Sequence, residues 1–79
     1  MNKTLDYYLS LHYPILLTQL SADDGGGWFA EIPLLEGCIS DGETPSEALV
    51  MIEDAKRGWL ASALELGINI PEPEKLLAH

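Results

Sequence analysis

Two pairs of neighbouring carboxylates are the residues of this sequence best suited to chemistry: Asp23 with Asp24, and Asp41 with Glu43. Two-metal hydrolases hold their ions with several convergent carboxylates on fixed elements. Here the first pair stands in a sequence typical of a turn, and Glu43 directly precedes a helix start, so we expect both pairs to be solvated. We assign no catalytic, metal-binding or cofactor-binding residue. A metal-dependent hydrolase using Asp41 with Asp23 or Glu31 stays open as an alternative function.

Three consecutive glycines, Gly25 to Gly27, follow the first acidic pair. Glycine-rich loops can bind phosphate, because a backbone without Cβ can point several N–H groups at one anion. No Lys or Arg accompanies these glycines, and the residues after them have the pattern of a strand rather than a helix. The sequence therefore predicts a turn that joins two strands of a hairpin.

The chain has one cysteine, Cys38, and two histidines, His12 and His79. A single cysteine cannot form an internal disulfide, and these three residues cannot complete a structural zinc site. A dyad of His12 with Cys38 stays open, although a strand cysteine more often packs as a small hydrophobe. The first residues lack the apolar run of a signal peptide, so the lone thiol indicates a reducing cytoplasm.

Charge is the most unusual global property of the chain, which has 13 Asp and Glu against 4 Lys and Arg and a formal net charge of -9. No basic side chain occurs between Lys3 and Lys56. Such a surface repels phosphate backbones, so we expect no direct binding to nucleic acid. It either keeps a small protein in solution or attracts a basic protein partner. No stretch approaches the roughly 20 apolar residues that cross a bilayer, so we expect no membrane segment.

Apolar spacing at residues 2–11 predicts a short helix that ends before Pro14. Residues 13–20 and 28–32 have the pattern of two strands, which we expect to pair antiparallel across the glycine turn. Pro33 cannot donate to a sheet ladder and should end the second strand. Residues 38–42 are then expected to form a third strand of the same meander.

A longer helix begins at Thr44, which is followed by Pro45 at the first helical position and by Glu47 in capping-box spacing. Gly67 is expected to end this helix. Residues 68–70 are expected to return as a short last strand. The helix has an apolar stripe that comprises Ala48, Leu49, Ile52, Ala55, Trp59, Leu60, Ala63 and Leu66.

The predicted elements follow the order α-β-β-β-α-β in one α+β domain over residues 1–79. It has an N-terminal helical segment at 1–12, a core at 13–73 and a loose tail at 74–79. A domain this small sits near the lower limit for a self-sufficient core. We therefore expect self-association as a dimer or tetramer, or a protein partner. A stand-alone oligomeric assembly domain is a second alternative function.

Side chains alternate along a strand, so the second strand presents different residues to its two faces. Trp28, Ala30 and Ile32 share one face, which we expect to pack on the long helix. Phe29 and Glu31 lie on the opposite face, where a sheet with one helical layer keeps apolar surface for a partner.

The run "DDGGGWFAEIPLLEGCISDGETPSEAL", preceded by "YPILL" and followed after the helix by "GINIPEP", resembles the HicB family of type II antitoxins. The resemblance covers about residues 13–73 in the correct order and spacing. It implies a partial RNase H-like fold that lacks the carboxylates of a nuclease, so the chain would not be an enzyme. It also implies that the chain binds a small basic mRNA-interferase toxin of the HicA type and neutralises it by covering its active site.

The resemblance gives the acidic surface a purpose, because carboxylates can compete for a toxin surface built to hold RNA. Many family members carry a C-terminal domain that binds the operon's promoter, whereas this chain ends six residues after Pro73. We therefore expect a short form that does not repress its promoter alone. The candidate toxin contacts, chosen for acidity or outward direction, are Asp23, Asp24, Phe29, Glu31, Glu36, Asp41 and Glu43.

Overall fold

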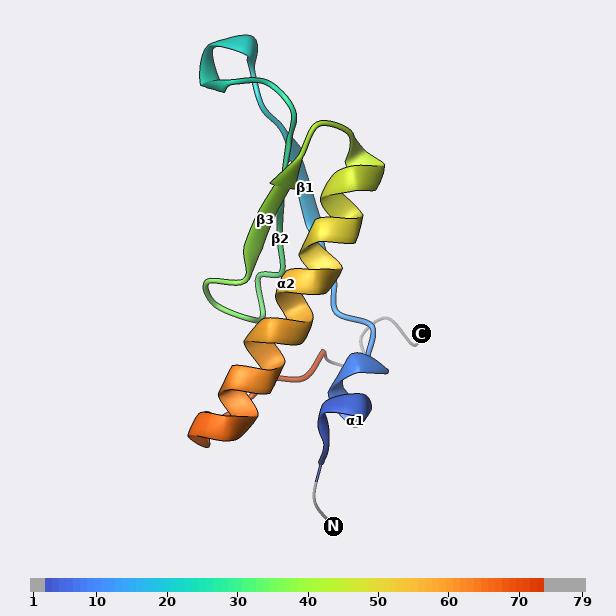
Figure 1. Cartoon of the computed structure of the whole chain (residues 1–79), viewed down its shortest axis with the longest axis vertical. Helices are drawn as coiled ribbons and strands as arrows, with labels where there is room; N and C mark the ends of the chain where they lie inside the picture. The colour runs from blue at the N-terminus through green and yellow to red at the C-terminus, as the bar shows by residue number, and fades with distance from the viewer. Residues whose placement is uncertain (1–2, 74–79) are drawn as a thin grey trace.

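The computed structural model describes residues 3–73 as a three-stranded sheet with one long helix on one face (Figure 1). The elements in chain order are α1 (Leu5–Leu9), β1 (Leu16–Gln19), the 3-10 helix η1 (Ala22–Asp24), β2 (Trp28–Glu31), β3 (Ile39–Gly42) and α2 (Pro45–Leu66). The strand order is β1-β2-β3, and both neighbouring pairs are antiparallel. The predicted α+β meander with a long helix is thus confirmed.

The glycine run is the tip of the β1–β2 hairpin, which extends past the start of α2 (Figure 1). Gly25, Gly26 and Gly27 have φ angles of 97°, 73° and 83°, a region that side chains with a Cβ rarely adopt. The Gly26 N–H donates to the Ser21 carbonyl at 2.8 Å, and the Ser21 hydroxyl donates to Asp24 Oδ2 at 3.0 Å. The glycines therefore provide the positive φ angles of a turn, as predicted.

The start of α2 has the predicted capping box. Thr44 Oγ1 accepts the Glu47 N–H at 3.0 Å, and Glu47 Oε1 accepts the Glu43 N–H at 2.6 Å. The end of β3 lies directly against this first turn, since a Cβ added to Gly42 would stand 2.5 Å from the Ala48 nitrogen. Only a glycine at the end of β3 allows this approach of strand and helix.

The core lies between α2 and the sheet. From α2 it takes Ala48, Ile52, Lys56, Leu60 and Ala63, and from the sheet and its β2–β3 connection it takes Ala30, Ile32, Leu35 and Cys38. The predicted stripe was wrong at two positions, because Leu49 is 39% exposed and Leu66 is 71% exposed. A helix of 22 residues is about 33 Å long and a strand of four residues about 13 Å, so Leu66 lies beyond the sheet.

Lys56 takes a place in the core that the sequence pattern did not assign to it. Its side chain is only 7% exposed, while its ammonium reaches the more exposed Glu53 carboxylate at 2.8 Å. A lysine can bury its methylene stem in this way when its charged end finds a partner.

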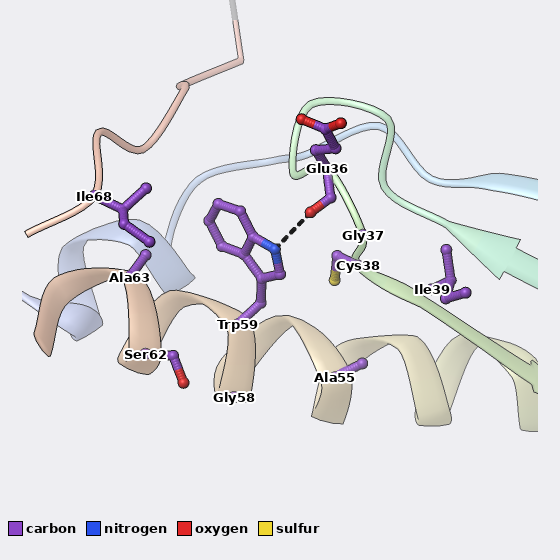
Figure 2. A pocket seen from close by; sticks show the side chains of 10 residues that line it. All are labelled: Glu36, Gly37, Cys38, Ile39, Ala55, Gly58, Trp59, Ser62, Ala63 and Ile68. Carbon is purple, nitrogen blue, oxygen red and sulfur yellow. Dashed lines mark hydrogen bonds between the residues drawn. The ribbon is translucent and has the colours of Figure 1, made fainter. Parts of the chain in front are cut away.

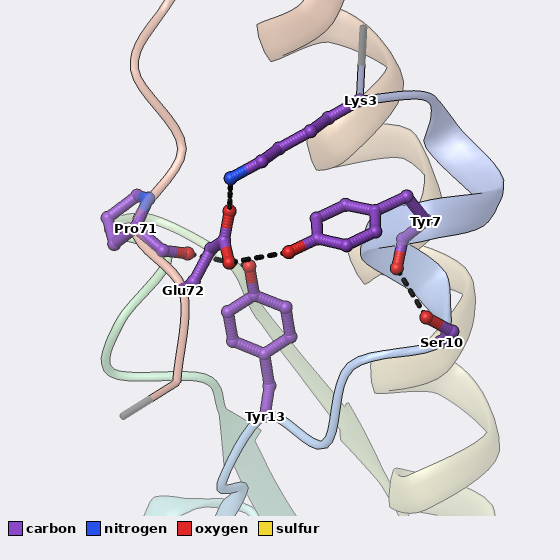
Figure 3. Close-up of polar contacts among 6 residues, drawn as sticks. All are labelled: Lys3, Tyr7, Ser10, Tyr13, Pro71 and Glu72. Atoms are coloured by element: carbon purple, nitrogen blue, oxygen red, sulfur yellow. Dashed lines mark hydrogen bonds and ion pairs between the residues drawn. The ribbon is translucent and has the colours of Figure 1, made fainter. Parts of the chain in front are cut away.

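The predicted last strand is wrong, because residues 68–70 form no strand. Side chains hold the residues that follow it: the Tyr13 hydroxyl donates to the Pro71 carbonyl at 2.6 Å, and the Tyr7 hydroxyl donates to Glu72 Oε1 at 2.8 Å (Figure 3). Lys3 forms an ion pair with the same Glu72 carboxylate. Pro71 and Pro73, which come directly after the expected strand, have no N–H to donate to a sheet ladder.

The predicted N-terminal helix is present but shorter than expected, with Thr4 as its N-cap. Thr4 Oγ1 accepts the Tyr7 N–H at 3.3 Å. The predicted tail at 74–79 lies outside the described residues.

Candidate protein-binding surface

The face of the sheet opposite α2 is covered by no helix or strand of residues 3–73. The strand register arranges its side chains in two cross-strand rows, because residues directly opposite each other share a face. We call this surface the open face, and its residues are Leu16, Glu31 and Ile39 in one row and Thr18, Phe29 and Asp41 in the other.

The open face combines aliphatic and aromatic groups with carboxylates. Leu16 is 51% exposed and Ile39 is 53% exposed, on either side of Glu31. Phe29 is half-buried, as expected, and Asp41 is exposed. A hollow of about 270 Å³ lies between Phe29, Ile39 and Asp41. Such a surface can bind a partner that offers apolar side chains and positive charge together.

The seven predicted candidates fall into separate groups. Phe29, Glu31 and Asp41 come together on the open face. Asp23 and Asp24 are exposed on η1 at the tip of the hairpin.

Glu43 lies near the hairpin tip but on the side of the helix start. There it lines a hollow of about 660 Å³ with Asp41, Glu47, Met51 and the glycines 25–27. The Glu47 carboxylate is already an acceptor for the Glu43 N–H. This hollow connects the acidic hairpin tip with the end of β3.

Glu36 lies in the β2–β3 connection, apart from the other six candidates. Its backbone carbonyl accepts the Trp59 indole N–H at 2.8 Å, and its carboxylate points away from α2 (Figure 2). The bond attaches the connection to the helix, so the backbone of Glu36 has a structural role.

The structure brings Leu16, Thr18 and Ile39 into the open face, none of which was among the candidates. Their strands show the alternation that assigns each residue to a face. The missing information was the register, since only pairing reveals that Leu16 and Ile39 stand on either side of Glu31.

Cys38 is a packing residue. It is 3% exposed, and burial raises the pKa of its thiol, while the nearby Lys56 charge acts in the opposite direction. A thiol held protonated is a poor nucleophile. His12, its proposed partner in a dyad, is exposed.

Within residues 3–73, no three His, Cys, Asp or Glu side chains come together in a group that could hold a metal ion. The same part of the chain has no helix with the length and apolar character needed to cross a membrane.

The structure is that of a small α+β protein whose open face is partly apolar, carries carboxylates and is covered by no described helix or strand. A family model described as the HicB-like antitoxin of bacterial toxin–antitoxin systems matches residues 13–79. The chain belongs to this HicB-like antitoxin family. Membership implies a toxin partner and suggests a role other than catalysis.

Two UPF0150 proteins are similar to the chain over most of its length. The one from Thermoplasma acidophilum is 30% identical over 71 residues, which are 87% of this chain and 99% of that protein. The one from Synechocystis sp. is 35% identical over 68 residues, which are 86% of this chain and 89% of that protein. No solved structure matches the chain.

Proposed function

We propose that this chain is an antitoxin that neutralises a small basic mRNA-interferase toxin of the HicA type by covering its active site. We further propose that its fold is a partial RNase H-like fold, that it works in the cytoplasm as a homo-oligomer, and that it neither binds nucleic acid directly nor acts as an enzyme. Family membership supports the toxin partner.

The open face is the observation that carries this proposal. A ribonuclease attracts RNA with positive charge. The Glu31 and Asp41 carboxylates can take the place of phosphates on such a surface, and Leu16, Phe29 and Ile39 add apolar area that excludes water.

Charge also supports a basic partner. With a formal net charge of -9, the whole chain attracts a cationic protein at long range. The hairpin tip adds Asp23 and Asp24, Glu43 lies beside the glycines of that tip, and Glu36 adds a carboxylate in the β2–β3 connection. We propose that these residues surround the contact made by the open face.

Co-expression with the small basic reading frame next to its gene tests the function. We expect a stable complex and rescue of the growth arrest that the toxin causes alone. The absence of both would refute the proposal.

A charge reversal tests whether the open face is the contact. Glu31→Lys should weaken toxin binding about tenfold or more, because it places like charges across the interface. Asp54→Lys is the matched control, since Asp54 is exposed on α2 away from the sheet and its substitution changes the net charge equally. Equal effects of the two variants, at low and at high salt, would show that only net charge matters and would refute the assignment of the open face.

A further inference from the structure

Phe29 is the aromatic residue of the open face, and it stands directly opposite Asp41 across the β2–β3 ladder. The Ile32 N–H donates to the Cys38 carbonyl at 3.1 Å, and hydrogen-bonded pairs alternate with non-bonded pairs along an antiparallel ladder. Three pairs further on, Phe29 and Asp41 therefore form a pair without backbone hydrogen bonds. Side chains approach most closely in such pairs, with Cβ atoms about 4.5–5.5 Å apart. The sheet thus holds the ring and the carboxylate as neighbours.

A hollow on the open face joins these two groups. It has a volume of about 270 Å³ and is lined by Phe29, Ile39, Ser40 and Asp41. Phe29 is half-buried, whereas Asp41 is exposed, so an anchored apolar wall stands beside a solvated carboxylate. A group that fills the hollow contacts the ring and the carboxylate together.

The described part of the chain supplies no cation to this carboxylate. Lys3 and Lys56 each form an ion pair with a glutamate elsewhere in residues 3–73. Arg57 is exposed on α2, which covers the other face of the sheet. The Asp41 carboxylate is therefore available to a cation that comes from a partner.

A guanidinium group fits this hollow better than other side chains do. It is planar, stacks on an aromatic ring, and its fork of N–H donors matches a carboxylate at two points. An ammonium group is a compact, strongly hydrated charge without a flat surface. An apolar side chain would take water away from the carboxylate without offering a hydrogen bond in return. The combination of ring and carboxylate therefore favours arginine.

A surface that holds RNA uses arginine for the same two contacts. Arginine binds phosphate oxygens bidentately, and its plane stacks on exposed bases. On the open face, Asp41 offers the anion and Phe29 offers the flat ring, at the spacing of one cross-strand pair. The two side chains together thus resemble the features of a nucleotide that an arginine binds.

We propose that Phe29 and Asp41 form an arginine subsite, which binds one arginine side chain of the toxin in place of a nucleotide of RNA. The guanidinium stacks on the Phe29 ring and donates to the Asp41 carboxylate. This rests on the proposed function, which supplies the basic partner, and it names the side chain that the open face selects. Glu31 stands between Leu16 and Ile39 without a ring beside it, so the other row takes no part in the stacking.

Isothermal titration calorimetry of the full chain with the toxin tests the ring. Phe29→Leu keeps an apolar side chain but removes the aromatic plane, so it should weaken toxin binding about two- to fivefold. Phe29→Tyr is the matched control, since it keeps the plane and should bind within about twofold of the wild-type chain. Equal affinities of the two variants would overturn the stacking contact.

The same titration tests the carboxylate. Asp41→Asn removes the charge and keeps the shape, so it should weaken toxin binding about tenfold or more. Asp54→Asn removes an equal charge from the exposed side of α2 and should change the affinity by less than about twofold at physiological ionic strength. Phe29→Leu should weaken binding less in the Asp41→Asn chain than in the wild-type chain, because both groups hold one guanidinium. Additive effects would overturn the shared subsite.

A second measurement uses no toxin. Two capped tripeptides, N-acetyl-Gly-Arg-Gly-amide and N-acetyl-Gly-Lys-Gly-amide, have equal charge and differ in the cationic group. The arginine peptide should shift the backbone amide resonances of Phe29 and Asp41 in the isotope-labelled full chain about twofold more than the lysine peptide does. Asp41→Asn should abolish this difference. Equal shifts from both peptides, or the largest shifts at Asp23 and Asp24, would overturn the subsite.

The two measurements distinguish failure of the subsite from failure of the proposed function. A toxin that binds the wild-type chain and both Phe29 variants equally leaves the antitoxin function in place and removes the arginine subsite. A toxin that does not bind refutes the proposed function and removes the toxin as the occupant, whereas the peptides still decide whether the hollow selects arginine.

Discussion

A pair of glycine substitutions provides the sharpest test of how α2 is seated on the sheet. Gly42→Ala adds a Cβ that would stand 2.5 Å from the nitrogen and 2.9 Å from the Cα of Ala48. Both atoms belong to the backbone of α2, and Ala48 is fully buried, so neither can rotate away. The first turn of the helix must move by about 1 Å to restore ordinary contact, which opens the packing between α2 and β3.

Overpacking of this kind costs about 1–3 kcal/mol, and we place Gly42→Ala at about 2 kcal/mol because the obstacle is backbone. Domains of this size have a total stability of about 4–12 kcal/mol, so the loss is a large fraction. It corresponds to a decrease in Tm of about 8–16 °C.

Gly58→Ala is the control with the opposite expected sign. Its Cβ would meet nothing within 4 Å, and alanine is favoured over glycine inside a helix by about 1 kcal/mol. Urea unfolding followed by circular dichroism measures both free energies at one protein concentration. If Gly42→Ala is as stable as the wild-type chain, the close approach of β3 to α2 described above is wrong.

Three further predictions concern the cap, the buried lysine and alkaline pH. Thr44→Ala leaves the Glu47 N–H without its acceptor and should lower the free energy of unfolding by about 1 kcal/mol in urea titrations, with Thr44→Ser as the control that retains the cap. Lys56→Met keeps the buried stem and removes the ammonium, so it should leave the free energy of unfolding unchanged or raise it by up to about 1 kcal/mol. Lys56→Ala should lower the free energy of unfolding by about 2 kcal/mol, because the packing of the stem is lost. An equal loss in both variants would contradict this prediction. Burial raises the pKa of Tyr13 to about 12, above its ordinary value of about 10, and its hydroxyl donates to the Pro71 carbonyl. The stability that this group contributes is therefore complete below about pH 10 and is lost as the pH rises through 12. Tm measured from pH 9 to 12 should fall less steeply for Tyr13→Phe, and identical slopes would show that other groups cause the alkaline loss.

Local chemistry determined the parts of the fold that could be predicted from the sequence. The capping box at Thr44 and the positive-φ glycines of the hairpin depend on residues within a few positions of each other. The alternation of β2 likewise assigned Ala30 to the core and Phe29 to the opposite face. Each of these signals is complete within one segment of the chain.

Long-range packing decided where the predictions failed. The apolar stripe of α2 included Leu66 and omitted Lys56, because a periodic pattern does not reveal where the sheet beneath the helix ends or which long side chain can reach an acid. The segment at 68–70 had the composition of a strand, but the hydroxyl of Tyr13, more than 50 residues away, holds the chain that follows it.

The sequence by itself determined that this is a small, acidic α+β chain with a three-stranded meander, and its ordered motifs indicated the antitoxin family that the comparison with known proteins shows. Only the tertiary structure decided which candidates form one surface. Periodicity states the face on which a residue lies, whereas its neighbours across the sheet depend on register, which the turns and the buried face set together. That register joins Leu16 and Ile39 to Glu31 and leaves the outer edge of β3 open.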